Sequence, residues 1–107
     1  MSGITTHVLD TARGRPAAGV PVRLERREGA GWRGIARGTT DDDGRLRSLT
    51  GPSIEAGTYR ITFDTGAYNA NGFFPEVSIV FEVNDAAQHY HVPLLLSPFG
   101  YSTYRGS

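Results

Sequence analysis

The segment Tyr59-Arg60-Ile61-Thr62-Phe63 decides the fold class, because apolar and polar side chains alternate along it. Successive side chains of a β-strand point to opposite faces of the sheet. The alternation therefore predicts a half-buried strand, with Tyr59, Ile61 and Phe63 inward and Arg60 and Thr62 facing water. The segment Val77-Ser78-Ile79-Val80-Phe81-Glu82-Val83 follows the same period of two and predicts a second strand of this kind.

Other short runs have the same character, rich in Val, Ile, Thr, Tyr and Phe and separated by clusters of Gly, Pro and Asp. The complete set of predicted strands is Ile4–Asp10, Val22–Glu28, Trp32–Thr39, Leu46–Leu49, Thr58–Asp64, Val77–Asn84, Gln88–Leu95 and Tyr101–Arg105. About eight strands at this spacing predict an all-β sandwich of two sheets. Residues 65–72 lack the period of two and are predicted to hold one short helix.

Length and composition limit the classes of function. A chain of 107 residues suits a single domain, 1–107. Its 11 basic residues balance 11 acidic ones, which gives no reason to expect a nucleic-acid or membrane partner. The chain has no Cys and no Lys, which excludes thiol catalysis, disulfides, Cys-ligated metals and Schiff-base lysines. None of its apolar runs approaches the ~20 residues that span a bilayer. The start of the chain does not resemble a signal peptide, so we expect a cytoplasmic protein.

The three histidines, His7, His89 and His91, are the first candidates for chemistry. Along a strand, His89 and His91 share one face, opposite the face that carries Tyr90, Val92 and Leu94. The apolar face is the expected core side, so His91 is predicted to point out of the sandwich. An outward histidine on a strand is ordinarily just solvated.

Two further interpretations of the histidines are weaker. His89, His91 and His7 are a conceivable zinc ligand set, but no carboxylate lies near the pair in sequence, so we predict no metal site. A Ser-His-Asp set can be assembled from Ser102, His91 and Asp10, but such sets can be found in most sequences. The residues alone predict a β-sandwich with outward His, Arg and Tyr side chains and no named reaction.

Three stretches together resemble the 5-hydroxyisourate hydrolases, the transthyretin-related enzymes of urate breakdown. These are Thr6-His7-Val8-Leu9-Asp10, Asp43-Gly44-Arg45, and His91-Val92-Pro93-Leu94-Leu95-Leu96-Ser97-Pro98 followed by Tyr101-Ser102-Thr103-Tyr104-Arg105-Gly106-Ser107. The resemblance covers nearly the whole chain, and the terminal Tyr-Arg-Gly-Ser is its most specific part. Glu76 departs from the pattern, where an aromatic residue is expected after the proline.

The resemblance implies a transthyretin-like sandwich of two four-stranded sheets with a short helix after the fifth strand. It implies a homotetramer, a dimer of dimers, with the active site at the dimer–dimer interface. It also implies hydrolysis of 5-hydroxyisourate to 2-oxo-4-hydroxy-4-carboxy-5-ureidoimidazoline without a cofactor or metal. The catalytic residues so implied are His7, Arg45, His91, Tyr104 and Ser107, of which His7, Arg45 and Tyr104 also bind substrate.

In that mechanism His7 and His91 share the work of activating water and supplying a proton to the ring nitrogen, in an order the sequence leaves open. Arg45 offers donors to the substrate carbonyl oxygens. Arg105 is expected to hold the terminus down, and His89 has no implied catalytic role. Two other readings stay open: a transthyretin-like protein that binds a small molecule without turnover, and a structural or adhesion-type sandwich.

Overall fold

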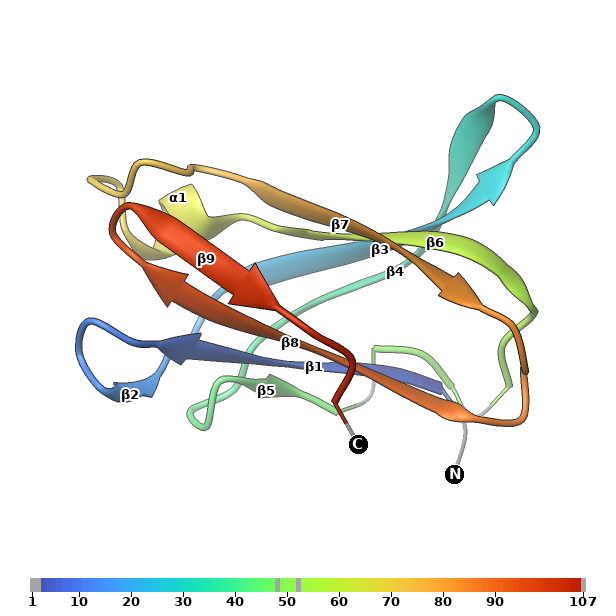
Figure 1. Cartoon of the computed structure of the whole chain (residues 1–107), viewed down its shortest axis with the longest axis horizontal. Helices are drawn as coiled ribbons and strands as arrows, with labels where there is room; N and C mark the ends of the chain where they lie inside the picture. The colour runs from blue at the N-terminus through green and yellow to red at the C-terminus, as the bar shows by residue number, and fades with distance from the viewer. Residues whose placement is uncertain (1–2, 48, 52, 107) are drawn as a thin grey trace.

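The structure, a computed structural model, describes residues 3–47, 49–51 and 53–106. These residues form two facing sheets (Figure 1). One sheet contains β1 (Gly3–Asp10), β2 (Arg15–Pro16), β5 (Arg45–Leu46), β8 (His89–Ser97) and β9 (Gly100–Thr103). The other contains β3 (Pro21–Glu28), β4 (Gly31–Thr39), β6 (Gly57–Phe63) and β7 (Val77–Val83). The two-sheet all-β sandwich predicted from the sequence is confirmed.

The strand order places β1 at the centre of the first sheet. That order is β2-β1-β8-β9, and β5 also pairs with β1, whereas the second sheet runs β4-β3-β6-β7. Every pairing is antiparallel except that of β1 with β8, which is parallel from Gly3 opposite His89 to Asp10 opposite Leu96. The parallel pair brings the two ends of the chain into one sheet.

The core lies between the sheets and consists of the inward side chains of both. Tyr59, Ile61 and Phe63 are fully buried, as the alternation predicts. From the first sheet they meet Val8, Tyr90, Val92 and Leu94, which belong to the same buried cluster. Thr62 corrects the prediction, because it is buried rather than exposed. It lies on the central strand β6 between Arg23 and Ser78 of the neighbouring strands, whose side chains cover it.

The predicted short helix is present as α1 (Thr65–Tyr68). The Asp64 side chain caps it by accepting a hydrogen bond from the Ala67 amide. Tyr68 then joins the helix to the end of β1, donating a 2.7 Å hydrogen bond to the Asp10 carboxylate. Burial raises the pKa of Asp10, but hydrogen bonds from Tyr68 and the Arg13 amide, with the Arg13 charge, outweigh it and leave that pKa lowered.

Two predicted strands need correction. Leu46–Leu49 is instead β5, Arg45–Leu46, because the chain meets β1 at only two positions before turning; Ser48 lies outside the described residues. Tyr101–Arg105 ends as a strand at Thr103, because the next partner on β8 is Pro93, which has no amide proton to donate. The same register resumes beyond the proline, where Gly106 pairs with His91.

The remaining predicted strands differ from the observed ones by one or two residues at their ends. Strand β2 was not predicted, because a two-residue pairing has too few residues for a period. Glu76, the departure from the family pattern, lies 3.6 Å from Arg23 as a surface ion pair. Within the described ranges, no helix has the length and apolar character needed to cross a membrane.

Truncation of Ile61 tests the position of the core. Ile61→Ala is expected to lower the free energy of unfolding by about 2–5 kcal/mol, because the side chain is fully buried. Ile35→Ala makes the same chemical change on β4 at a side chain 36% exposed and should cost below about 1 kcal/mol. Urea unfolding of both variants measures the difference, and equal losses would contradict this core.

The Tyr68–Asp10 contact predicts a pH-dependent stability. A carboxylate with a lowered pKa in the folded state stabilises the fold above its unfolded pKa and loses that contribution as pH falls. Tyr68→Phe should therefore cost about 1.5–3 kcal/mol at pH 7 and less at an acid pH below the lowered pKa of Asp10. Urea unfolding at both pH values measures this, with Tyr101→Phe, at an exposed ring, as control. A loss independent of pH would show that the hydroxyl does not act through Asp10.

Candidate active site

Three predicted residues meet on the outer face of the first sheet, where β5, β1 and β8 lie side by side (Figure 1). His7 is paired with Arg45 on one side and with Pro93 on the other, and Thr5 is paired with His91. Paired residues on neighbouring strands point to the same face of the sheet. His7, Arg45 and His91 are therefore neighbours on one face, although they are remote in sequence.

The turn before β5 fixes the backbone of Arg45. The Asp41 carboxylate accepts hydrogen bonds of 2.9 Å from the amides of Asp43 and Arg45. Gly44 takes a φ of +73° and presses against β1, with its carbonyl 2.7 Å from the Val8 amide. A Cβ at Gly44 would overlap the Val8 carbonyl oxygen, so glycine is required there for both reasons.

The same turn orients His7. Its Nε2 lies 2.8 Å from the carbonyl oxygen of Asp43. A carbonyl only accepts hydrogen bonds, so Nε2 carries the proton and donates it. In the neutral ring this leaves the lone pair on Nδ1, which makes His7 a directed proton acceptor.

His91 is half-buried, and its Nδ1 lies 2.8 Å from the hydroxyl oxygen of Thr5. Its pKa is lowered from the ordinary value of 6.5, first by burial and then by the positive charges of His89, Arg45 and His7. Both causes disfavour the imidazolium. His91 is thus neutral at physiological pH.

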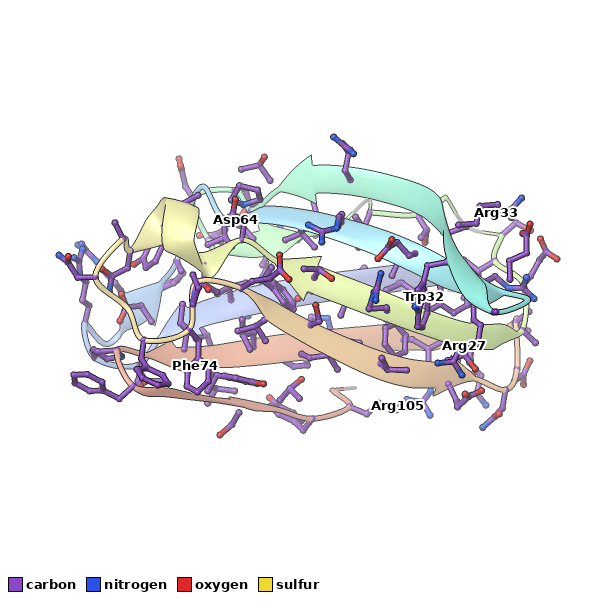
Figure 2. The ribbon with its side chains drawn as sticks, turned by 90° about the horizontal axis from the view of Figure 1, so that it is seen from above. Arg27, Trp32, Arg33, Asp64, Phe74 and Arg105 are labelled. Atoms are coloured by element: carbon purple, nitrogen blue, oxygen red, sulfur yellow. The ribbon has the colours of Figure 1, made fainter. Side chains whose placement is uncertain are left out.

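The end of the chain lies against His91. The Gly106 amide donates a 2.8 Å hydrogen bond to the His91 carbonyl oxygen. Arg105, labelled in Figure 2, places its guanidinium 4.4 Å from the centroid of the Tyr90 ring and donates a 3.0 Å hydrogen bond to Gln88. These contacts agree with the anchoring role expected for Arg105.

Two of the predicted site residues are not placed in this group. Tyr104 is 59% exposed and lines an apolar groove at the open edge between β7 and β9, beside Phe81 and Val92. Ser107 lies outside the described residues.

Sequence reasoning missed Thr5 and gave His89 no role. The Thr5 hydroxyl oxygen lies 2.8 Å from His89 Nε2 as well as 2.8 Å from His91 Nδ1. The period of two puts His89 and His91 on one face, but only the register with β1 brings Thr5 between them. Among residues 3–47, 49–51 and 53–106, no three His, Asp or Glu side chains form a group that could hold a metal.

Residues 4–106 match the model of the HIUase/Transthyretin family. The chain belongs to this family. A 5-hydroxyisourate hydrolase of Caulobacter vibrioides is 50% identical, covering 100% of both chains. The structure of a Klebsiella pneumoniae 5-hydroxyisourate hydrolase has a TM-score of 0.87 at 39% identity, over 99% of this chain and 100% of that one. Transthyretin from Sparus aurata has a TM-score of 0.91 at 34% identity, over 99% and 97%.

The family thus contains both enzymes and transthyretins on one backbone, and the TM-scores do not separate them. A shared fold does not determine function, so the site residues must. The transthyretin-like architecture expected from the sequence is confirmed.

Gly106→Ala tests the docking of the terminal segment. A Cβ at Gly106 would lie 2.6 Å from His91 Cδ2 and 3.3 Å from Pro93 Cγ, so the segment has to move away. We expect the residue 106 amide to lose about tenfold or more of its protection from hydrogen exchange, corresponding to about 1.4 kcal/mol, while the sandwich stays folded. Gly100→Ala is the control, because its Cβ would meet only Ser97 at an ordinary 3.6 Å. Unchanged exchange in Gly106→Ala would contradict the docking.

Proposed function

We propose that this protein hydrolyses 5-hydroxyisourate in urate degradation. The observation that carries the proposal is the meeting of His7, Arg45 and His91 on one sheet face, in a chain 50% identical over its full length to a 5-hydroxyisourate hydrolase. The substrate is a small oxidised purine with electrophilic carbonyl groups. Its hydrolysis needs a base for water, a proton for the departing nitrogen and stabilisation of an oxyanion.

The proposed base is His7. Its Nε2 proton is held by the Asp43 carbonyl, so Nδ1 is the nitrogen free to take a proton from water. The resulting hydroxide adds to the acyl carbon, the bond from that carbon to the ring nitrogen breaks, and the nitrogen takes a proton. His91, on the neighbouring strand, is the proposed donor of that proton.

Arg45 is the proposed electrostatic group. Its guanidinium has fixed donors suited to a carbonyl oxygen that gains negative charge as water adds. The turn bonded through Asp41 and packed at Gly44 holds its backbone, so little rearrangement is needed during the reaction. Its positive charge also helps to keep His91 neutral.

The outer face of the first sheet, which carries the site, is open to solvent in one chain. This supports a further part of the proposal, that a homotetramer forms and covers the site. His7, Arg45 and His91 are only half-buried in one chain, and an enzyme of this kind needs to exclude bulk water. The edge strands β7 and β9 carry the exposed apolar side chains Val80 and Tyr101, which suit contacts with a second chain. In this assembly Tyr104 binds substrate, and Ser107 helps to position water or Arg105. The cytoplasmic location stays a prediction.

A second candidate is a transthyretin-like binding protein without turnover. The TM-score of 0.91 to Sparus aurata transthyretin favours it. A binding protein requires the sandwich but not the directed His7, the neutral His91 and Arg45 together. We therefore place hydrolysis first.

Ultraviolet absorbance tests the reaction directly. Freshly made 5-hydroxyisourate should decay much faster with the protein than alone, and Arg45→Ala should lower kcat/KM by about 10²–10³. Arg33→Ala is a matched control on the opposite sheet, where Arg33 is exposed and paired with Glu28 at 3.3 Å. His91→Asn should also abolish most turnover. No acceleration by the folded wild type would overturn the proposal and favour the binding protein.

A further inference from the structure

The Thr5 hydroxyl has two imidazole partners, and the mechanism above uses only one of them. Its oxygen lies 2.8 Å from His89 Nε2 and 2.8 Å from His91 Nδ1. The backbone pairing creates this arrangement, because Thr5 on β1 is opposite His91 on β8. His89 is opposite Gly3, which has no side chain, so its ring reaches toward Thr5 without an obstacle.

A hydroxyl carries one proton, which couples the two rings. If Thr5 donates to His91 Nδ1, its oxygen accepts from His89 Nε2–H, and the remaining proton of neutral His91 is on Nε2. If Thr5 instead donates to His89 Nε2, then His91 has its proton on Nδ1 and a bare Nε2. The presence or absence of a proton on His89 Nε2 therefore decides which nitrogen of His91 is the donor.

Neutral imidazole is a poor acid, so neutral His91 needs help to donate a proton. The coupling to His89 through Thr5 would supply that help. His91 is neutral because of burial and the surrounding charges of His89, Arg45 and His7. If it gave up its Nε2 proton with nothing in exchange, it would become an imidazolate, which is unfavourable. The ring stays neutral throughout if one proton arrives at Nδ1 while the other leaves from Nε2.

We propose that His89, Thr5 and His91 form a proton relay and that Thr5 and His89 are positioning residues for His91. Protonated His89 passes its Nε2 proton to the Thr5 oxygen, the Thr5 proton moves to His91 Nδ1, and the His91 Nε2 proton goes to the departing ring nitrogen. Water loses one proton to His7 and its hydroxide to the substrate carbon, so the protons balance. The relay resets when the bare Nε2 of half-buried His91 takes a proton from solvent, the His91 Nδ1 proton returns to the Thr5 oxygen, and the Thr5 proton returns to His89 Nε2.

The surroundings of the relay are consistent with this direction. His91 is faced by His7 of β1 and Arg45 of β5, and its carbonyl is held by the Gly106 amide. His89 stacks beside His91 with ring centroids 6.2 Å apart, and Arg105 Nη2 lies 3.4 Å from its carbonyl oxygen. Burial and the adjoining charges disfavour a positive charge on His91, so this ring is suited to passing a proton on while it stays neutral.

The relay is tested first by its tautomers, independently of turnover. In protein labelled with ¹⁵N-histidine, neutral His91 should be mainly the Nε2–H tautomer where His89 Nε2 carries a proton, and mainly Nδ1–H where it does not. Thr5→Val removes the hydroxyl at nearly constant shape and should uncouple the two, whereas Thr5→Ser keeps the hydroxyl and the coupling. A His91 tautomer ratio in Thr5→Val that still follows the occupancy of His89 Nε2 would overturn the relay.

The kinetic test rests on the proposed function. Thr5→Val should lower kcat about 10- to 100-fold, with KM changed less than about threefold, because only proton delivery is lost. Thr5→Ser should retain most of kcat, whereas His89→Gln should lower kcat to the same range as Thr5→Val, because the relay then has no proton source. The relay would be overturned if Thr5→Ser lost as much kcat as Thr5→Val. It would also be overturned if kcat were unchanged in both Thr5→Val and His89→Gln. If the wild type does not hydrolyse the substrate, the proposed function fails while the tautomer test still decides the relay.

Discussion

The parallel pairing of β1 with β8 is the constraint on which the rest of the structure depends. It joins residues from the two ends of the chain over eight consecutive positions, from Gly3 with His89 to Asp10 with Leu96. One set of alternating side chains enters the core, including Val8 and Leu94, and the other set faces outward as Thr5, His7 and His91. A shift of one residue would exchange the two faces. The burial of the apolar set therefore holds the histidines on the outside.

Two backbone features complete the site on this framework. Gly44 allows the turn at 41–44 to press against β1, which directs the Asp43 carbonyl to His7 and places Arg45 beside it. Pro93 interrupts the ladder between β8 and β9, and pairing resumes only at Gly106 against His91. Both features involve residues that carry no reactive group, yet they determine where the reactive groups lie.

The charges on the outer face explain how one backbone serves both enzymes and transthyretins. The sandwich requires only the buried side chains, so the outer face is free to vary with little effect on folding. In this chain burial, and then the charges of His89, Arg45 and His7, lower the pKa of His91. Grouping positive charge in this way costs stability, and a carbonyl-rich substrate would offset that cost by accepting hydrogen bonds. Elsewhere on the molecule the arginines are placed differently, as where Arg27 lies over Trp32 on the second sheet (Figure 2). Arg60 lies over the same ring, 4.5 Å from its centroid.

The sequence by itself determined the sandwich, most strand positions, the short helix and the outward direction of His91, because alternation with a period of two is a local property. The family resemblance supplied His7, Arg45 and His91 as a set, and Tyr104 and Ser107 as its completion. Only the tertiary structure decided which strands are neighbours, and therefore that Thr5 lies between His89 and His91. It also decided where β9 ends and that Thr62 is covered, because both depend on the partner strands. Register between strands 86 residues apart is set by packing of the whole core, which no short stretch of sequence contains.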